Sequence, residues 1–412
     1  MFAFIARQPI LDREKDVFAY ELLFRDGKGG TYPKEDPAKA DLIAKHYHTL
    51  GLNDIACDKT SFINFSSDTL LERFPTSLDP ETVVIEIDED PSNNHTLISA
   101  CRHIKDMGYK LALDDPGLLS GKSSLLPIID VVKVDIVKSN YDIIEQNLPR
   151  FLDADVTLVA EHVDSQRDFS ICRELGFNYF QGYFFAKPEN LKPVAPLPAS
   201  KMTLVQLIGE SSSSEFSIDK VNDIISRDAA LSYMLLKFIN NPTINKRYKI
   251  NSLRHALTYM GEVEIKKFVA LLALANLGDD KPMELLHMSL VRAHFCDLVA
   301  KEKGIGSNPP TGFLVGLFSL LDALLDQKME QVLSQIPLVE EVSDALLGKK
   351  SELSMYLALV KAFESATWLN VIRLAEALNI DQKRLHSLFN EAIVWGNSVR
   401  QSISPHYPAA VP

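Results

Sequence analysis

The feature that most constrains the fold is a regular alternation, over about the first 190 residues, of short β-rich runs with amphipathic segments. Such runs predict strands, and strands separated by helices predict βα units around a parallel sheet. Seven strands are predicted, with an eighth available near the N-terminus. They lie at residues 2–6, 18–24, 62–65, 83–87, 110–113, 131–134, 157–160 and 178–183. This pattern favours an α/β fold, a TIM-like (β/α)8 barrel.

Nearly every predicted strand ends in a charged or amide residue. These residues are Glu21, Asn64, Glu86, Asp114, Asp115, Lys133, Glu161 and Gln181. A (β/α)8 barrel places its active site at the carboxyl ends of its strands, where converging carboxylates repel one another unless a cation lies between them. Oxygen donors of this kind suit Mg²⁺, Mn²⁺ or Ca²⁺, and two such ions are the usual arrangement for attack on a phosphodiester. The alternative is that the acids lie separately at loop tips in water.

A proline-bearing stretch divides the chain. Pro188, Pro193, Pro196 and Pro198 remove amide donors and favour extended backbone. Beyond it, apolar residues recur at helical spacing. We therefore expect a barrel at 1–190, a linker at 191–201, an all-helical domain at 202–395 and a tail at 396–412.

Composition narrows the possible partners and location. A formal net charge of −12 argues against long nucleic acids as partners. The four cysteines form no CxxC pair, which fits a reducing cytoplasm. The longest apolar stretches, at 268–275 and 313–325, fall short of the roughly 20 residues that a bilayer requires. We expect a cytoplasmic protein without membrane insertion.

Seven stretches of the predicted barrel resemble, in order, the motifs of EAL domains. They are Glu21-Leu-Leu-Phe-Arg25, Asn64-Phe-Ser66, Val84-Ile-Glu86-Ile-Asp-Glu89, Leu113-Asp114-Asp115, Val132-Lys133-Val-Asp135, Ala160-Glu161-His-Val163 and Gln181-Gly-Tyr183. EAL domains are modified TIM barrels that hydrolyse the bacterial second messenger cyclic di-GMP to linear pGpG. The resemblance covers roughly residues 1–190.

This resemblance implies a centre of two divalent metal ions, Mg²⁺ or Mn²⁺. The first ion would be held by Glu21, Asn64, Glu86 and Asp114. Asp114 would also bind the second ion, together with Asp115. Cyclic di-GMP is accordingly the implied ligand.

The resemblance also implies roles in catalysis and substrate binding. Glu161 is similar to the glutamate that orients the attacking water and accepts its proton. Lys133 is similar to the lysine that contacts the water and the scissile phosphate, where developing negative charge needs compensation. Arg25 resembles a phosphate-binding arginine, and Gln181 and Gln8 match positions near the metals or ligand.

One loop departs from the family pattern. The family's loop begins Asp-Asp-Phe-Gly-Thr-Gly-Tyr-Ser-Ser and couples dimerisation to metal binding, whereas this chain reads Asp114-Asp115-Pro-Gly117-Leu-Leu-Ser-Gly-Lys-Ser-Ser124. Pro116 fixes φ and removes an amide donor beside two proposed ligands. Glu89, in contrast, looks like the retained glutamate that anchors this loop. A homodimer through the barrel is one arrangement that this resemblance allows.

The helical half resembles HDOD domains, helical relatives of HD phosphohydrolases that lack the metal site. The resemblance rests on two stretches, which begin at Asp228 and Ile250, and it covers about residues 202–395. No His-Asp dipeptide occurs in the chain, so this half has no HD-type metal chemistry. We expect it to be a noncatalytic domain that binds a protein partner.

The predicted function is that of a metal-dependent cyclic di-GMP phosphodiesterase with an HDOD interaction or regulatory domain. Two alternatives stay open because the loop after Asp115 is altered. One is a receptor or scaffold that binds cyclic di-GMP without cleaving it. The other is an adaptor that has lost nucleotide binding as well.

Overall fold

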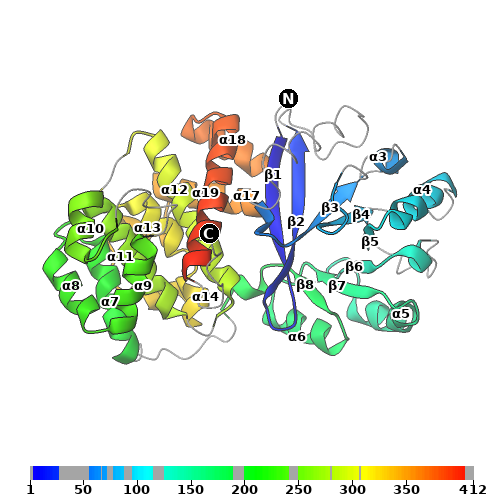
Figure 1. Cartoon of the computed structure of the whole chain (residues 1–412), viewed down its shortest axis with the longest axis horizontal. Coiled ribbons are helices and arrows are strands. Elements are labelled where there is room, and N and C mark those ends of the chain that lie inside the picture. The colour runs from blue at the N-terminus through cyan, green and yellow to red at the C-terminus, as the bar shows by residue number, and fades with distance from the viewer. Residues whose placement is uncertain are drawn as a thin grey trace. The chain divides into compact units, whose positions relative to one another are not determined.

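The computed structural model describes residues 3–26, 55–65, 67–71, 78–87, 95–114, 125–188, 199–240, 249–278, 281–305 and 308–403. The chain forms two compact units. The first comprises Met1–Phe185 with Glu364–Ala366, and the second comprises Ala186–Phe363 with Thr367–Pro412. The first unit contains strands and helices, whereas the described elements of the second are helices (Figure 1). The predicted barrel followed by an all-helical region is confirmed.

Eight strands close the barrel in the order β1 to β8. They are β1 (Ala3–Leu11), β2 (Val17–Asp26), β3 (Thr60–Phe65), β4 (Val83–Ile87), β5 (Lys110–Asp114), β6 (Val131–Asp135), β7 (Thr157–Glu161) and β8 (Tyr179–Gln181). Strands β2 to β8 run parallel, but β1 pairs antiparallel with both β2 and β8. Strand β1 thus departs from the parallel arrangement that the βα units predict, within a barrel that is otherwise as expected.

The connection between β1 and β2 explains this exception. A parallel pair needs a crossover of a dozen or more residues, whereas an antiparallel pair needs only a tight turn. Here the Asp12 carboxylate accepts the backbone N–H groups of Glu14 and Asp16 at 3.0 and 2.9 Å, which closes a short turn. Lys15 in this turn has a φ of 67°. The hairpin reverses β1 while the barrel still closes.

The helices of the first unit lie beside strands β3 to β8 (Figure 1). They are α3 (Ser67–Leu71), α4 (His95–Asp106), α5 (Tyr141–Asp153) and α6 (Gln166–Glu174), with short 3₁₀ turns η3 (Leu126–Ile128) and η4 (Phe184–Ala186). The side chains of Asn140 and Ser165 accept backbone N–H groups at the starts of α5 and α6. Such N-caps satisfy donors that a helix leaves unbonded, so they fix where these helices begin.

The interior of the barrel contains a layer of apolar side chains, with every strand but β8 contributing one buried residue. These are Ile10, Ala19, Phe62, Val84, Ala112, Val131 and Val159. Because alternate residues of a strand face the same side, the residues two positions further toward the barrel mouth face inward as well. The apolar layer, called the apolar floor below, therefore lies directly beneath the polar residues of the mouth.

The described elements of the second unit are all helices. They are α7 (Ala199–Ser212), α8 (Ile218–Ser226), α9 (Ala229–Ile239), α10 (Leu253–Met260), α11 (Glu262–Leu277), α12 (Met283–Glu302), α13 (Thr311–Leu317), α14 (Leu321–Leu325), α15 (Met329–Leu333), α16 (Glu340–Leu346), α17 (Glu352–Glu364), α18 (Trp368–Leu378) and α19 (Gln382–Ile403). Helix α12 packs against α13 and α19, and α11 packs against α7. None of the helices within the described ranges is long and apolar enough to cross a membrane.

Two helices cross the expected boundaries of this unit. Helix α7 begins at Ala199, inside the expected linker 191–201, because good helix formers follow Pro198 directly. Helix α19 continues through Ile403, well into the expected tail 396–412. Its last turns bury Asn397 and Val399, so packing against the unit extends the helix beyond the predicted end.

Gly182 provides a test of how tightly the end of β8 is packed. A Cβ at this position, where φ is +150°, would lie 2.1 Å from the carbonyl oxygen of Val163, whereas a Cβ at Gly176, where φ is +97°, would have no atom within 4 Å. Both alanine variants incur backbone strain of about 1–2 kcal/mol. We expect Gly182→Ala to cost about 1–3 kcal/mol more than Gly176→Ala, because only the former also forces an overpacking shift. Calorimetric melting of the two variants measures this difference, and equal melting temperatures would contradict it.

Candidate active site

The mouth of the barrel holds a second layer of inward-facing side chains, two residues beyond the apolar floor. Glu21 follows Ala19 in this way, Glu86 follows Val84, and Glu161 follows Val159. The strand register places Asn64 beside Glu86 and Asp114 beside Lys133. Residues that come from strands far apart in the sequence therefore meet at one end of the barrel.

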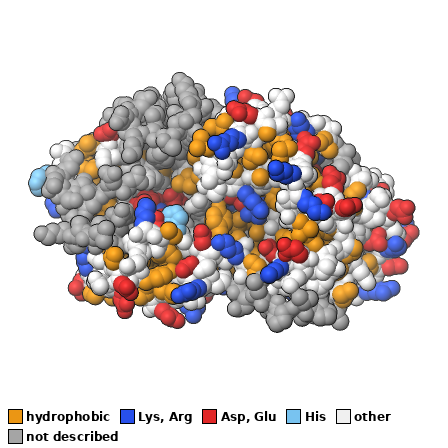
Figure 2. Space-filling model, turned by 180° about the vertical axis from the view of Figure 1, so that it is seen from behind, with side chains coloured by type: hydrophobic (Ala, Val, Ile, Leu, Met, Phe, Trp, Pro, Cys, Tyr) orange, Lys and Arg blue, Asp and Glu red, His pale blue; other side chains and the backbone are white. Residues whose placement is uncertain are grey.

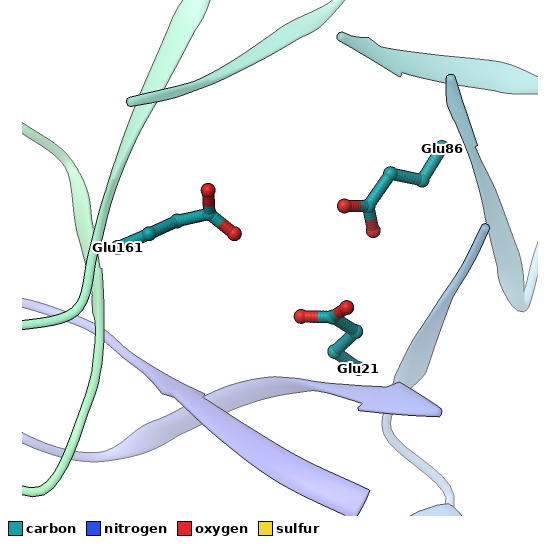
Figure 3. A group of neighbouring side chains, drawn as sticks. All are labelled: Glu21, Glu86 and Glu161. Atoms are coloured by element: carbon teal, nitrogen blue, oxygen red, sulfur yellow. The ribbon is translucent and has the colours of Figure 1, made fainter. Parts of the chain in front are cut away.

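Lys133 is the centre of this layer. Its side chain is fully buried, and its Nζ lies 3.1 Å from Glu21 Oε2, 2.5 Å from Glu86 Oε1 and 2.7 Å from Glu161 Oε1. One oxygen from each glutamate lies within 4.8 Å of the others. Figure 3 shows the three carboxylates pointing toward one another from separate strands. A single ammonium thus stands among three buried acids, which the sequence had predicted to converge.

Two glutamines extend this network toward β1 and β8. Gln181 Nε2 donates to Glu21 Oε2 at 2.5 Å and to Gln8 Oε1 at 3.0 Å. Gln8 lies opposite Glu21 in the β1–β2 hairpin. Ile10, two residues after Gln8, belongs to the apolar layer. Because β1 runs antiparallel to β2, the mouth lies on the N-terminal side of Ile10, and Gln8 therefore falls in the polar layer.

Burial dominates the electrostatics of the site. It raises the pKa of Glu86 well above its ordinary value, and the neighbouring Glu21 raises it further. Burial also raises the pKa values of Asp114 and Glu161. For Lys133, burial by itself would lower the pKa, but the surrounding carboxylates outweigh it and raise the pKa well above the ordinary value. Lys133 therefore stays charged, and among the described residues of the mouth the three glutamates and Asp114 outnumber this ammonium.

The site has the donor set that a divalent cation requires. Glu86 Oε2, Asp114 Oδ1 and Gln181 Oε1 are buried oxygens that accept no hydrogen bond within the described residues. Unsatisfied buried acceptors are costly, and such hard oxygen atoms are what Mg²⁺ and Mn²⁺ bind. The residues present thus fit a divalent metal.

The structure does not describe the side chains of three predicted site residues. Asp115 and Glu89 lie outside the described residues. Arg25 belongs to β2, opposite Phe4 in the hairpin. The second proposed metal position, the loop anchor and the phosphate-binding arginine therefore stay predictions.

Asp135 is a residue of the mouth to which the sequence analysis gave no role. It is buried, its Oδ1 accepts the backbone N–H groups of Val137 and Lys138 at 2.9 and 3.1 Å, and its Oδ2 lies 3.3 Å from His162 Nδ1. It also pairs with Glu161 in the β6–β7 register. The sequence does contain a signal for Asp135. It lies two residues after Lys133, and alternate residues of a strand face the same side, so both side chains lie on the same face of β6.

Comparison with known proteins adds two domain matches. A family model described as EAL domain matches residues 45–188, and one described as HDOD domain matches residues 197–349. The chain is 34% identical to the cyclic di-GMP phosphodiesterase CdgJ of Vibrio cholerae, over 97% of this chain and 94% of that protein. It is 33% identical to the uncharacterized protein YuxH of Bacillus subtilis, over 96% of this chain and 98% of that protein.

Solved structures give a weaker likeness. A complex of Klebsiella pneumoniae BlrP1 with calcium and cyclic di-GMP is 21% identical, covers 44% of this chain and 55% of that chain, and has a TM-score of 0.38. The strand pairing described above, rather than this likeness, establishes the barrel.

The buried ammonium yields a stability test. Lys133→Met leaves three buried carboxylates without their cation, and removing one partner of a buried ion pair costs about 3–5 kcal/mol. We expect a large fall in the melting temperature in metal-free buffer, and a partial recovery when Mg²⁺ or Mn²⁺ is added. Lys138→Met is the matched control, because the Lys138 side chain is 67% exposed and its ion pair is worth about 1 kcal/mol or less. Equal melting of the two variants would exclude a central role for Lys133 in holding the mouth together.

Proposed function

This chain belongs to the family of proteins that join an EAL domain to an HDOD domain, and from that premise we propose that its barrel hydrolyses cyclic di-GMP to linear pGpG. The observation that carries the proposal is the polar layer at the barrel mouth. It combines a buried ammonium, three carboxylates within 4.8 Å of one another and buried oxygens that accept no hydrogen bond within the described residues. Phosphodiester hydrolysis needs such a concentration of metal ligands, base and positive charge.

Two divalent ions, Mg²⁺ or Mn²⁺, would be held by this chain's own oxygen ligands. Glu21, Asn64, Glu86 and Asp114 would hold the first ion, and Asp114 with Asp115 the second. When bound, such ions polarise phosphoryl oxygens and lower the pKa of water. The raised pKa values of Glu86 and Asp114, caused first by burial, support this assignment, because a cation would remove the cost of their charge.

Glu161 is the proposed proton acceptor. It lies at the end of β7, and burial raises its pKa, which brings the carboxylate closer to the range in which a base is effective near neutral pH. Its Oε1 is 2.7 Å from Lys133 Nζ. The same ammonium can therefore orient Glu161 and compensate negative charge on the reacting phosphate.

Four residues are proposed to act in substrate binding or to support it. Arg25 is proposed to hold a phosphate through two parallel N–H donors. Gln181 and Gln8, which hydrogen-bond each other, are proposed to contact the metals or ligand from β8 and β1. Glu89 is proposed to anchor the loop that follows Asp115.

We further propose a cytoplasmic protein whose HDOD unit is noncatalytic and binds a protein partner, and whose barrel can pair with a second copy. The sequence supports the noncatalytic role, since it contains no His-Asp dipeptide. Figure 2 shows basic and acidic side chains interspersed on one face of the molecule. A mixed surface of this kind, together with the net charge of −12, favours protein contacts over long nucleic acids.

The base can be tested by Glu161→Gln. This variant keeps the shape of the side chain but cannot accept a proton, so we expect it to bind cyclic di-GMP and to hydrolyse it at least about a hundredfold more slowly. Chromatographic separation of cyclic di-GMP from pGpG, with Mg²⁺ or Mn²⁺ present, measures the rate. Glu174→Gln is the matched control, because Glu174 is an exposed acid at the end of α6. Equal rates in both variants would remove Glu161 from its role, and tight binding without product in the unmodified protein would favour the receptor.

The metal ligands can be tested by Asp114→Ala. Asp114 is proposed to contact both ions, so its removal should abolish hydrolysis and reduce the number of Mn²⁺ ions bound per chain. Equilibrium dialysis against Mn²⁺ counts the ions, and circular dichroism checks that the barrel is intact. Retained hydrolysis in a folded variant would contradict the two-ion assignment.

A further inference from the structure

The helical unit contains a pocket of about 350 Å³ that takes no part in the proposed reaction. Its lining comes from α10 to α13 and from α19, and all the residues named below lie in described segments. The volume falls in the range of small-molecule sites, about 300–1,000 Å³. Its walls combine aromatic rings with charged side chains, so a matching ligand needs both a flat apolar part and polar groups.

The charged wall is centred on Asp297. Both Lys267 Nζ and Lys301 Nζ lie 2.8 Å from Asp297 Oδ2, and Lys267 also lies 3.0 Å from Glu264 Oε1. Asp297 and Lys267 are buried, whereas the Lys301 side chain is 55% exposed. A lysine ammonium has three protons, so Lys301 keeps donors for a ligand at the rim. Asp297 Oδ1 makes no hydrogen bond within the described residues and is an acceptor beside the pocket.

The aromatic wall is formed by His294, Trp395 and Phe313. The rings of His294 and Trp395 stack at 4.5 Å and 14°, and Phe313 meets Trp395 edge to face at 6.1 Å. Burial lowers the pKa of His294 to about 4, so its ring is neutral at pH 7 and offers one donor and one acceptor. Neither ring nitrogen hydrogen-bonds another described residue. The wall thus places aromatic rings beside the polar atoms of His294.

We propose that this pocket binds a purine nucleoside monophosphate, with the base against the aromatic wall and the phosphate at Lys301. A purine has π-faces that stack on aromatic side chains and an edge that carries both donors and acceptors. An aliphatic ligand would leave the polar atoms of Asp297 and His294 desolvated and unpaired. The inference goes beyond the proposed function, because none of these residues belongs to the barrel.

The chain offers a local reporter for this binding. It contains two tryptophans, Trp395 in the pocket wall and Trp368 at the start of α18. Incorporation of fluorotryptophan gives one ¹⁹F resonance for each, and Trp368→Phe assigns them. On titration of the full chain with GMP or AMP, we expect the Trp395 resonance to shift saturably while the Trp368 resonance stays in place.

Variants then locate the ligand. Lys301→Met and His294→Phe should each weaken binding by about tenfold or more, the loss expected for a charge-assisted or buried hydrogen bond. Lys349→Met is the matched control, since Lys349 pairs with Asp344 on the surface of the same unit and is 62% exposed. His294→Phe keeps a ring against Trp395, and if it nevertheless fails to fold, Lys301→Met decides.

Three outcomes would overturn the proposal. They are no shift of the Trp395 resonance with millimolar GMP and AMP, equal affinity in Lys301→Met and Lys349→Met, and binding of inorganic phosphate or ribose phosphate as tight as that of AMP. Hydrolysis of cyclic di-GMP by the barrel is measured separately, so failure here leaves the proposed function standing, and the reverse holds as well.

Discussion

The barrel mouth depends on one interaction, the contact of the Lys133 ammonium with three buried carboxylates. Glu21, Glu86 and Glu161 come from different strands, and like charges brought this close would push the strands apart without a cation between them. Lys133 supplies that cation from β6, with distances of 2.5 to 3.1 Å. The single positive charge of Lys133 can neutralise only one of the three carboxylates, however. The mouth therefore keeps the negative charge that is typical of a cation-binding site.

This imbalance links stability to function. A barrel that gathers more acids than it can neutralise gains stability when a divalent cation binds, because the cation removes the repulsion that burial amplifies. The same buried environment raises the pKa of Glu161, the proposed base. The polar layer proposed to be catalytic therefore adds repulsion to the fold, whereas the apolar layer beneath it, from Ile10 to Val159, is buried and stabilises the barrel.

The helical unit follows a different design. Its polar groups are largely paired in the described part, as in the contact of His287 with Glu284 within α12 and its contact with Asn397, which joins α12 to α19. The pocket beside Trp395 differs because Asp297 and His294 keep polar atoms available at its surface. Polar atoms that hydrogen-bond each other hold helices together. Polar atoms that line a pocket beside aromatic rings can instead hydrogen-bond a ligand.

The sequence by itself determined the barrel, the helical half and the acids of the mouth. The alternation of strands and helices predicts the fold, and the polar residues that end the strands predict that the site lies at the barrel mouth. Both predictions are possible because the periodicity of a strand is visible in consecutive residues. What only the tertiary structure decided is how the groups meet. The reversal of β1, the place of Lys133 among three glutamates, the contacts of Asp135 and the pocket on α11 and α12 all depend on strand register and helix packing. These join residues up to 173 positions apart, as Gln181 and Gln8 are, and no local pattern encodes a distance between side chains that only the closed fold brings together.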